Sequence, residues 1–213
     1  AGALKPEFFA PLILAIGAFI VTFSNKQKLN QKAEIAVGFG VLFIGLSFMS
    51  SSIGVYQSSP IFAKAFEVLG GNPILGILVG AVVTAIIQSS SASVGILQTL
   101  AMKGIVNWRS AVFITLGQNI GTCITALLSS AGANKTAKRA AVIHLSFNII
   151  GAAIYGIIMT IFFGVFDHLA MQHISSTEIS IFHSIFNVSV TVLLFPFANV
   201  LVKLSGLIIH EEP

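Results

Sequence analysis

The polar segment Gln88–Ser91 has the residue types best suited to bind a small ion. It lies halfway along a stretch, Val68–Met102, that contains no charged residue. Hydroxyl groups donate and accept hydrogen bonds, so the same side chains can contact a cation or an anion. Polar groups in an apolar surrounding need partners. We therefore predict a ligand site here; polar contacts between packed helices are the alternative.

A second polar segment, Gly117–Thr122, lies inside another apolar stretch. Two glycines that flank Gln118 and Asn119 predict a break in a membrane helix, which would free backbone carbonyls for ion binding. The alternative is a close contact between two helices, because Gly117 and Gly121 have the spacing of small residues at such contacts.

These two segments supply the predicted ligands. Substrate and ions are assigned to Gln88, Ser89, Ser90, Ser91, Gln118, Asn119 and Thr122, with Thr84, Ser93 and Thr125 as secondary candidates. Sodium, a hard cation that favours oxygen ligands, is assigned to Gln88, Ser89, Asn119 and Thr122. The long apolar stretches contain neither carboxylates nor deep basic residues, so helix N-termini and bound cations must hold an anion.

The pattern His-x-x-Phe-Asn occurs twice, near the start of two apolar stretches. Histidine and asparagine four residues apart share one face of a helix. We interpret His144 with Asn148, and His183 with Asn187, as structural polar pairs, because buried polar groups need partners. A proton-relay role for the histidines is the alternative. The single cysteine, Cys123, is expected to be a packing residue.

The composition predicts an integral membrane protein. Of 213 residues, 55% are hydrophobic and 8% are charged, whereas soluble domains have about 25% charged residues. Only helices and closed barrels satisfy their backbone groups in lipid, and continuous apolar runs exclude barrel strands. We expect an all-α integral membrane protein with about five transmembrane helices and one re-entrant helical hairpin. The expected spans are residues 8–22, 35–55, 110–130, 140–163 and 179–202.

Three regions follow from this reading. Residues 1–34 are a first span and a basic loop, and residues 35–163 are a unit with the hairpin (68–102) and the broken helix (110–131). Residues 164–213 are an outer loop, the last span and a C-terminal tail. Residues 59–69 read as a short interfacial helix.

The distribution of charges predicts the orientation. Lysine and arginine concentrate on the cytoplasmic side of membrane proteins, and two basic loops are expected, at residues 26–32 and 135–139. This places the N-terminus outside and the C-terminus inside a bacterial cytoplasmic membrane. The net charge of +4 then reports orientation, and no nucleic-acid partner is expected.

At the segments Gly80–Ala92, Gly117–Thr122 and His144–Asn148 the chain resembles the sodium–phosphate cotransporter family. The resemblance implies two inverted repeats, each with a Gln-Ser-Ser-Ser hairpin, that bind substrate and sodium between their tips and move in an elevator-like cycle. This chain has one such unit and is similar to the second. The resemblance therefore implies a partner unit, either an N-terminal half that this chain lacks or a second copy of it.

The expected function is sodium-coupled transport of inorganic phosphate, with sodium as coupling ion and no other cofactor. Transport of another small oxyanion or a dicarboxylate, or a non-transporting docking or sensing module, are the alternatives. An enzyme is not expected, because Ser90 lacks the Gly-x-Ser-x-Gly context of a serine hydrolase.

Overall fold

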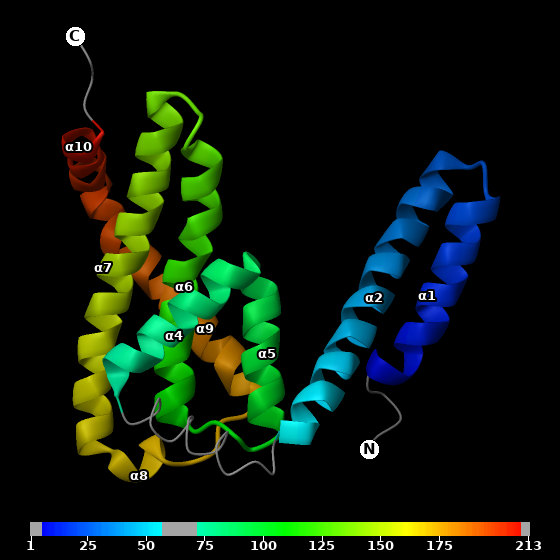
Figure 1. The fold of residues 1–213 in the computed structure, drawn as a ribbon, viewed down its shortest axis with the longest axis horizontal. Helices are drawn as coiled ribbons and strands as arrows, with labels where there is room; N and C mark the ends of the chain where they lie inside the picture. Colours follow the sequence, from blue (N-terminus) through cyan, green and yellow to red (C-terminus); the bar gives the residue numbers. More distant parts are fainter. Residues whose placement is uncertain (1–5, 57–71, 210–213) are drawn as a thin grey trace. The chain divides into compact units, whose positions relative to one another are not determined.

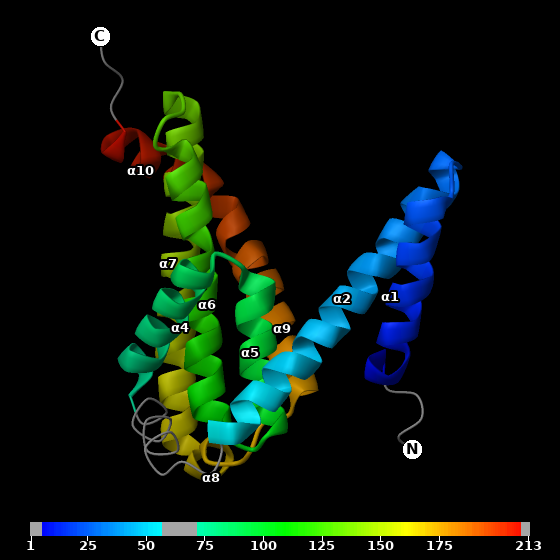
Figure 2. The same cartoon turned by 45° about the vertical axis from the view of Figure 1, so that its right-hand side comes forward.

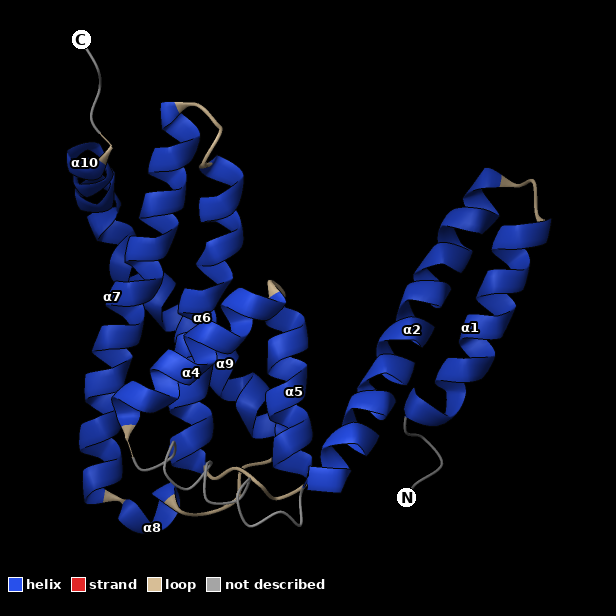
Figure 3. Cartoon of the chain, viewed as in Figure 1, coloured by secondary structure: helices blue, strands red, loops and turns tan. Residues whose placement is uncertain are grey.

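The computed structural model describes residues 6–56 and 72–209, which are helical apart from turns and short connections (Figure 3). The all-α prediction is confirmed for these residues. The chain divides into two compact units, residues 1–56 and 57–213, and each is described by itself. The predicted interfacial helix at 59–69 lies outside the described residues.

The first unit is a pair of packed helices, α1 (Pro6–Phe23) and α2 (Gln27–Tyr56). Glycine allows the close packing, because a Cβ on Gly40 would lie 2.6 Å from the Cβ of Leu14. The predicted basic loop at 26–32 is wrong for most of its length, since α2 already begins at Gln27. Lysine favours helix, so the chain turns in the short segment before Gln27.

The second unit is built on two long helices, α6 and α7, which lie side by side in both ribbon views (Figures 1 and 2). The shorter α4 and α5 join in a V against α6, and α9 crosses on the other side. The elements are α4 (Pro73–Ile87), α5 (Ser90–Met102), α6 (Trp108–Ser130), α7 (Lys135–Val165), α8 (Asp167–Ala170), α9 (Ser176–Leu194), the 3₁₀ turn η1 (Phe195–Phe197) and α10 (Ala198–Ile208).

The apolar core of this unit lies between α6, α7 and α9. Phe113, Phe163 and Phe186 are each 1% exposed and pack with smaller residues such as Val112 and Val190. Phe113 and Phe163 meet edge to face, with ring centroids 6.1 Å apart, a favoured aromatic geometry. This core fixes three of the four helices whose polar residues form the site.

The predicted break at Gly117–Thr122 is wrong, because α6 is one continuous helix from Trp108 to Ser130. The glycines of α6 instead allow the backbone of α4 to pack closely against it. A Cβ on Gly117 would overlap the carbonyl of Ile77, and a Cβ on Gly80 of α4 would overlap the carbonyl of Ile114. The small-residue contact, the alternative in the sequence analysis, is therefore what the structure contains.

Three described helices are long and apolar enough to cross a membrane: Trp108–Ser130, Lys135–Val165 and Ser176–Ile208. α1 and α4 contribute shorter apolar helices. The predicted basic loop at 135–139 is also wrong, since those residues form the first turns of α7 and the loop is residues 131–134. Asn134 caps α7 by accepting from Ala137 N–H at 2.9 Å, so the helix begins before the cations.

The end of the last predicted span also differs. We expected one helix over 179–202, but α9 stops at Leu194 and a 3₁₀ turn containing Pro196 separates it from α10. Proline lacks the N–H that would continue the helical bonding. α10 then turns away from α9 (Figure 2).

Candidate functional site

The turn between α4 and α5 places the N-terminus of α5 at the site. α4 ends at Ile87. The next residue, Gln88, adopts the left-handed conformation (φ 57°, ψ 21°) and donates its N–H to Thr84 O at 2.8 Å. This conformation is uncommon outside glycine and often marks functional positions. Ser89 then caps α5, its hydroxyl accepting from Ala92 N–H at 3.3 Å. The predicted division of 68–102 at Gln88–Ser91 is present in the described part of that segment.

The first turn of α5 keeps unused donors. The carbonyl of Ser89 accepts from Ser93 N–H at 3.0 Å and its hydroxyl from Ala92. The N–H groups of Ser90 and Ser91 have no intrahelical acceptor, as at any helix start. The positive end of α5 is therefore available to an anion.

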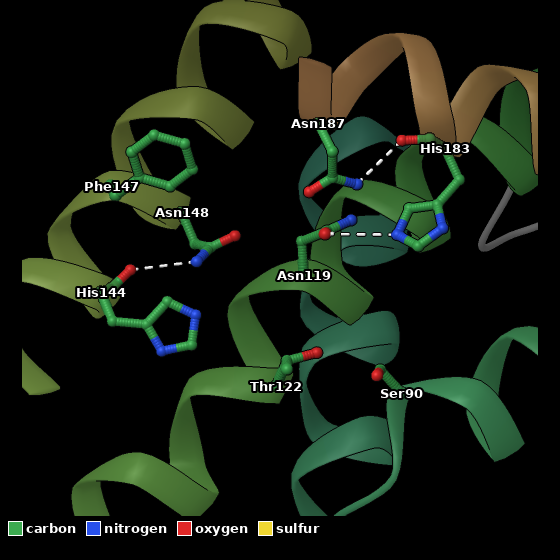
Figure 4. A pocket seen from close by; sticks show the side chains of 8 residues that line it. All are labelled: Ser90, Asn119, Thr122, His144, Phe147, Asn148, His183 and Asn187. Atoms are coloured by element: carbon green, nitrogen blue, oxygen red, sulfur yellow. Dashed lines mark hydrogen bonds between the residues drawn. The ribbon is translucent and has the colours of Figure 1, made fainter. Parts of the chain in front are cut away.

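A cavity of about 310 Å³ lies beside this helix start, among α5, α6, α7 and α9. Figure 4 shows that side chains from all four helices face it. Its lining residues are Ser90, Asn119, Thr122, His144, Phe147, Asn148, His183 and Asn187. Segments nearly 100 residues apart in the sequence (about the span from Ser90 to Asn187) thus meet at one polar cavity.

Asn119 is fixed in orientation by two helices. Its Nδ2 donates to Thr115 O at 2.9 Å, one turn earlier on α6. Its Oδ1 lies 3.3 Å from His183 Nε2 on α9, so that ring nitrogen carries the proton and donates. Asn119 can accept a further contact through Oδ1, and the Nδ1 of His183 remains for another partner.

The two other asparagines present their oxygens to the cavity. Asn148 donates its Nδ2 to His144 O at 3.0 Å and contacts Cys123 Sγ at 3.3 Å. Asn187 donates its Nδ2 to His183 O at 2.8 Å. Both amide nitrogens are thereby engaged within the protein, and no described group donates to either Oδ1. Figure 4 shows these oxygens turned towards the shared space.

The imidazole of His144 also faces the cavity without a protein partner. It is exposed, and none of the described side chains or carbonyls bonds to its ring nitrogens. His144 lies in the tenth position of the apolar helix α7. An ionisable side chain inside an apolar membrane helix makes its position a candidate for function.

The cavity contains only part of the predicted ligand set. Ser90, Asn119 and Thr122 come together as predicted, but Gln88, Ser89 and Ser91 lie exposed at the turn and do not line the cavity. The four residues interpreted as structural pairs do line it. Their repeated His-x-x-Phe-Asn pattern was the signal available in the sequence.

Gln118 and the secondary candidates Thr84 and Ser93 form a separate buried cluster. Gln118 Nε2 donates to Ser93 O at 2.9 Å and to Ser93 Oγ at 3.0 Å, and Thr84 Oγ1 donates to Ser93 Oγ at 2.7 Å. These bonds tie α4, α5 and α6 together behind the turn. Thr125 Oγ1 donates to Thr122 O at 3.1 Å and does not line the cavity.

Comparison with known proteins now adds an observation independent of the geometry. The family described as Na+/Pi-cotransporter matches residues 2–51 and 57–196, most of both units. The chain belongs to this family. The predicted resemblance is confirmed.

Curated relatives agree with this membership. YqeW of Bacillus subtilis is 30% identical over 200 residues, which are 94% of this chain and 64% of YqeW. YjbB of Escherichia coli K12, whose name refers to inorganic phosphate export, is 25% identical over 208 residues, or 97% of this chain and 38% of YjbB. The rat sodium-dependent phosphate transport protein 2A is 34% identical over 138 residues, or 57% of this chain and 21% of that protein.

The chain therefore spans less than two thirds of the length of these relatives. No solved structure matches it. The family and its named members point to phosphate transport across a membrane, sodium-dependent in the mammalian ones. The names of YjbB and of the rat protein describe transport and not catalysis, which agrees with the expectation that the chain is not an enzyme.

Proposed function

We propose that this chain is one unit of a sodium-coupled phosphate transporter in a bacterial cytoplasmic membrane, and that the cavity lined by Ser90 and Asn119 binds phosphate and sodium together. The observation that carries the proposal is the lining itself. Unused N–H donors at the start of α5 and unused amide oxygens on α7 and α9 face one space. The N–H donors suit an anion, and the amide oxygens suit a cation.

Phosphate would lie at the start of α5. The hydroxyl and the N–H of Ser90 offer donors there, and the helix dipole adds partial positive charge. The ring of His144 offers another donor from the opposite wall. No Lys or Arg lines the cavity among the described residues, so the anion needs a cation nearby to balance its charge.

Sodium would supply that charge. Asn119 and Thr122, two of the predicted ligands, contribute an amide oxygen and a hydroxyl, and Asn148 and Asn187 add two amide oxygens. A hard cation favours such neutral oxygens. A cation and an anion in adjacent positions each lower the desolvation cost of the other, which gives a physical reason for coupled binding.

A second unit would complete the site. Gln88, Ser89 and Ser91 are exposed at the tip of the hairpin, and polar groups facing hydrocarbon without partners are costly. In a re-entrant hairpin the tip lies inside the membrane, so another protein surface has to cover it. That surface is a second hairpin, from an N-terminal half or from another copy of the chain. Gln88 and Ser89 could then reach sodium from the tip.

The test is uptake of radioactive phosphate by vesicles that contain the purified chain, with an inward sodium or potassium gradient. The proposal expects uptake with sodium that greatly exceeds uptake with potassium, and a loss of at least tenfold in Ser90→Ala and in Asn119→Ala. Ser180→Ala, on α9 outside the cavity, is the control. Competition with sulfate and dicarboxylates separates phosphate from the alternative substrates. Phosphate uptake that is equal with sodium and potassium and does not saturate would favour a docking module.

Cross-linking tests the second unit. Ser89→Cys places a thiol at the exposed tip, and the native Cys123 is buried. If two copies pair at their tips, a short bifunctional reagent in native membranes yields a covalent dimer. The same reagent on Ser129→Cys, at the far end of α6, should yield none. Equal dimer yields from both positions would contradict tip-to-tip pairing.

A further inference from the structure

The last apolar stretch is too long to cross a membrane in one straight helix. Residues Ser176–Ile208 form a helical stretch of 33 residues with an apolar middle, which would be about 50 Å long as one helix, against a hydrocarbon core of about 30 Å. α9 has 19 residues, or about 28 Å, and so matches the core by itself. The 3₁₀ turn at Pro196 directly follows this helix, so the length of α9 would place it near the edge of the hydrocarbon core.

α10 departs from the direction of α9 after this turn. Figures 1 and 2 together show its axis lying across the long helices α6 and α7. One side packs on α7: Leu201 and Ser205 are buried, and Arg139 Nε donates to Ser205 Oγ at 3.4 Å. Gly206 lies against the same arginine: a Cβ there would lie 2.8 Å from an Arg139 guanidinium nitrogen, which the flexible arginine side chain can relieve by shifting.

The outer faces of α10 are amphipathic. Val200, Leu204 and Leu207 lie three and four residues apart and form one apolar stripe, and Leu207 is 71% exposed. Asn199 and Lys203 lie on a neighbouring polar stripe and are also exposed. A helix with this division of residues suits the boundary between hydrocarbon and headgroups.

Among the described residues, the charges at this end of the unit are all positive. Lys135, Lys138 and Arg139 begin α7, and Lys203 lies on α10. The described carboxylates of the unit, Asp167 and Glu178, lie at the other ends of α7 and α9. Cations in the first turns of a helix are destabilised by its dipole, so a surrounding negative surface would relieve that repulsion.

We propose that α10 lies in the plane of the membrane surface at the cytoplasmic side, with Val200, Leu204 and Leu207 in the acyl region, and that the basic side chains of α7 and α10 contact anionic phospholipid headgroups. This surface is defined by Lys135, Lys138 and Lys203. It is separate from the phosphate cavity and does not depend on the transport proposal. A lipid surface fits because the apolar stripe of α10 lies beside Lys203 and the cations in the first turns of α7.

The depth of α10 is measured with a single tryptophan. Trp108 is the one native tryptophan, so Trp108→Phe provides a silent background for Leu207→Trp in lipid vesicles. Lipids brominated near the headgroup should quench this tryptophan more strongly than lipids brominated near the chain ends. Val188→Trp, exposed in the middle of α9, is the matched control and should show the opposite order.

The headgroup preference is measured by comparing brominated phosphatidylglycerol with brominated phosphatidylcholine. The proposal expects the anionic lipid to bind more strongly at the site near Leu207→Trp. In Lys138→Gln and in Lys203→Gln, the affinity for the anionic lipid should fall by about fivefold for each cation removed. Lys103→Gln, at the other end of the unit, should leave the preference unchanged. The whole chain is used, so the carboxylates of Glu211 and Glu212 are present.

Two results would overturn the interfacial placement of α10, and a third would overturn the headgroup contact. If lipids brominated near the chain ends quench Leu207→Trp most strongly, α10 continues the membrane span. A tryptophan that neither lipid quenches would mean that protein, such as a second copy of the chain, covers the apolar stripe. Equal affinity for the two lipids, unchanged by Lys203→Gln, would refute the anionic headgroup contact while leaving the interfacial helix in place.

Discussion

Replacing Gly117 with alanine tests how closely α4 approaches α6. The added Cβ would overlap the carbonyl of Ile77 and lie 2.8 Å from the backbone nitrogen of Ala81. Both neighbours are backbone atoms of a helix, so no side-chain rotation relieves the clash. Overpacking of a core costs about 1–3 kcal/mol, and we expect the upper end, about 3 kcal/mol, because the two helices must move apart.

This cost is large enough to measure by thermal unfolding in detergent, followed by circular dichroism. For a chain of this size a loss of 1 kcal/mol lowers the melting temperature by about 2–4 °C, so Gly117→Ala should lower it by about 6–12 °C. Gly164→Ala is the control, because a Cβ there meets nothing within 4 Å, and it should change stability by less than about 0.5 kcal/mol.

A flexible break at Gly117 would make Gly117→Ala raise the melting temperature instead of lowering it. Alanine favours helix over glycine by about 1 kcal/mol, so a substitution in an unpacked break would stabilise the protein. A melting temperature for Gly117→Ala equal to or above that of the native chain would therefore refute the close packing of α4 on α6.

Three further predictions concern side chains. Ser93→Ala removes the hydroxyl that accepts from Thr84 and should cost about 1–3 kcal/mol in chemical unfolding, whereas the exposed Ser91→Ala should cost almost nothing. His144→Gln should raise the phosphate concentration needed for half-maximal thermal stabilisation at least threefold. Stability in the absence of phosphate should not change, because the His144 ring has no protein partner. An unchanged phosphate response would remove His144 from the site. Arg109→Gln breaks the 2.9 Å ion pair with Asp167 but, since that carboxylate is 73% exposed, should cost less than about 1 kcal/mol, and a loss above 2 kcal/mol would show that this pair is more than a surface contact.

The apolar helices and the turn at Gln88–Ser91 could be predicted from the sequence, because both depend on local properties. Charge-free stretches require a lipid-facing helix, and four consecutive polar residues in such a stretch favour an interruption at Gln88–Ser91. Ser90, Asn119 and Thr122 could be placed together because the segments that contain them are the most polar within the apolar stretches.

The errors came from residues whose role depends on distant parts of the chain. Gly117 and Gly121 permit either a helix break or a close helix contact, and only the packing of α4 decides between them. The repeated His-x-x-Phe-Asn pattern marked His144 and His183, and each pairs with its asparagine within one helix. The pattern alone does not show that the two helices bring these residues to the start of α5. The end of the last span depended on Pro196, whose effect was underestimated within an otherwise apolar stretch.

The central claim is that the cavity binds phosphate together with sodium, and equilibrium binding of radioactive phosphate to the purified chain in lipid tests it most directly. Binding is measured in sodium and in potassium for the native chain and for Asn148→Leu, which removes an amide oxygen from the cavity wall but not a donor at α5. We expect tight binding in sodium, at least tenfold weaker binding in potassium, and loss of the sodium effect in Asn148→Leu. Phosphate affinity that is equal in the two salts, or a sodium effect that survives in Asn148→Leu, would contradict this account of the site.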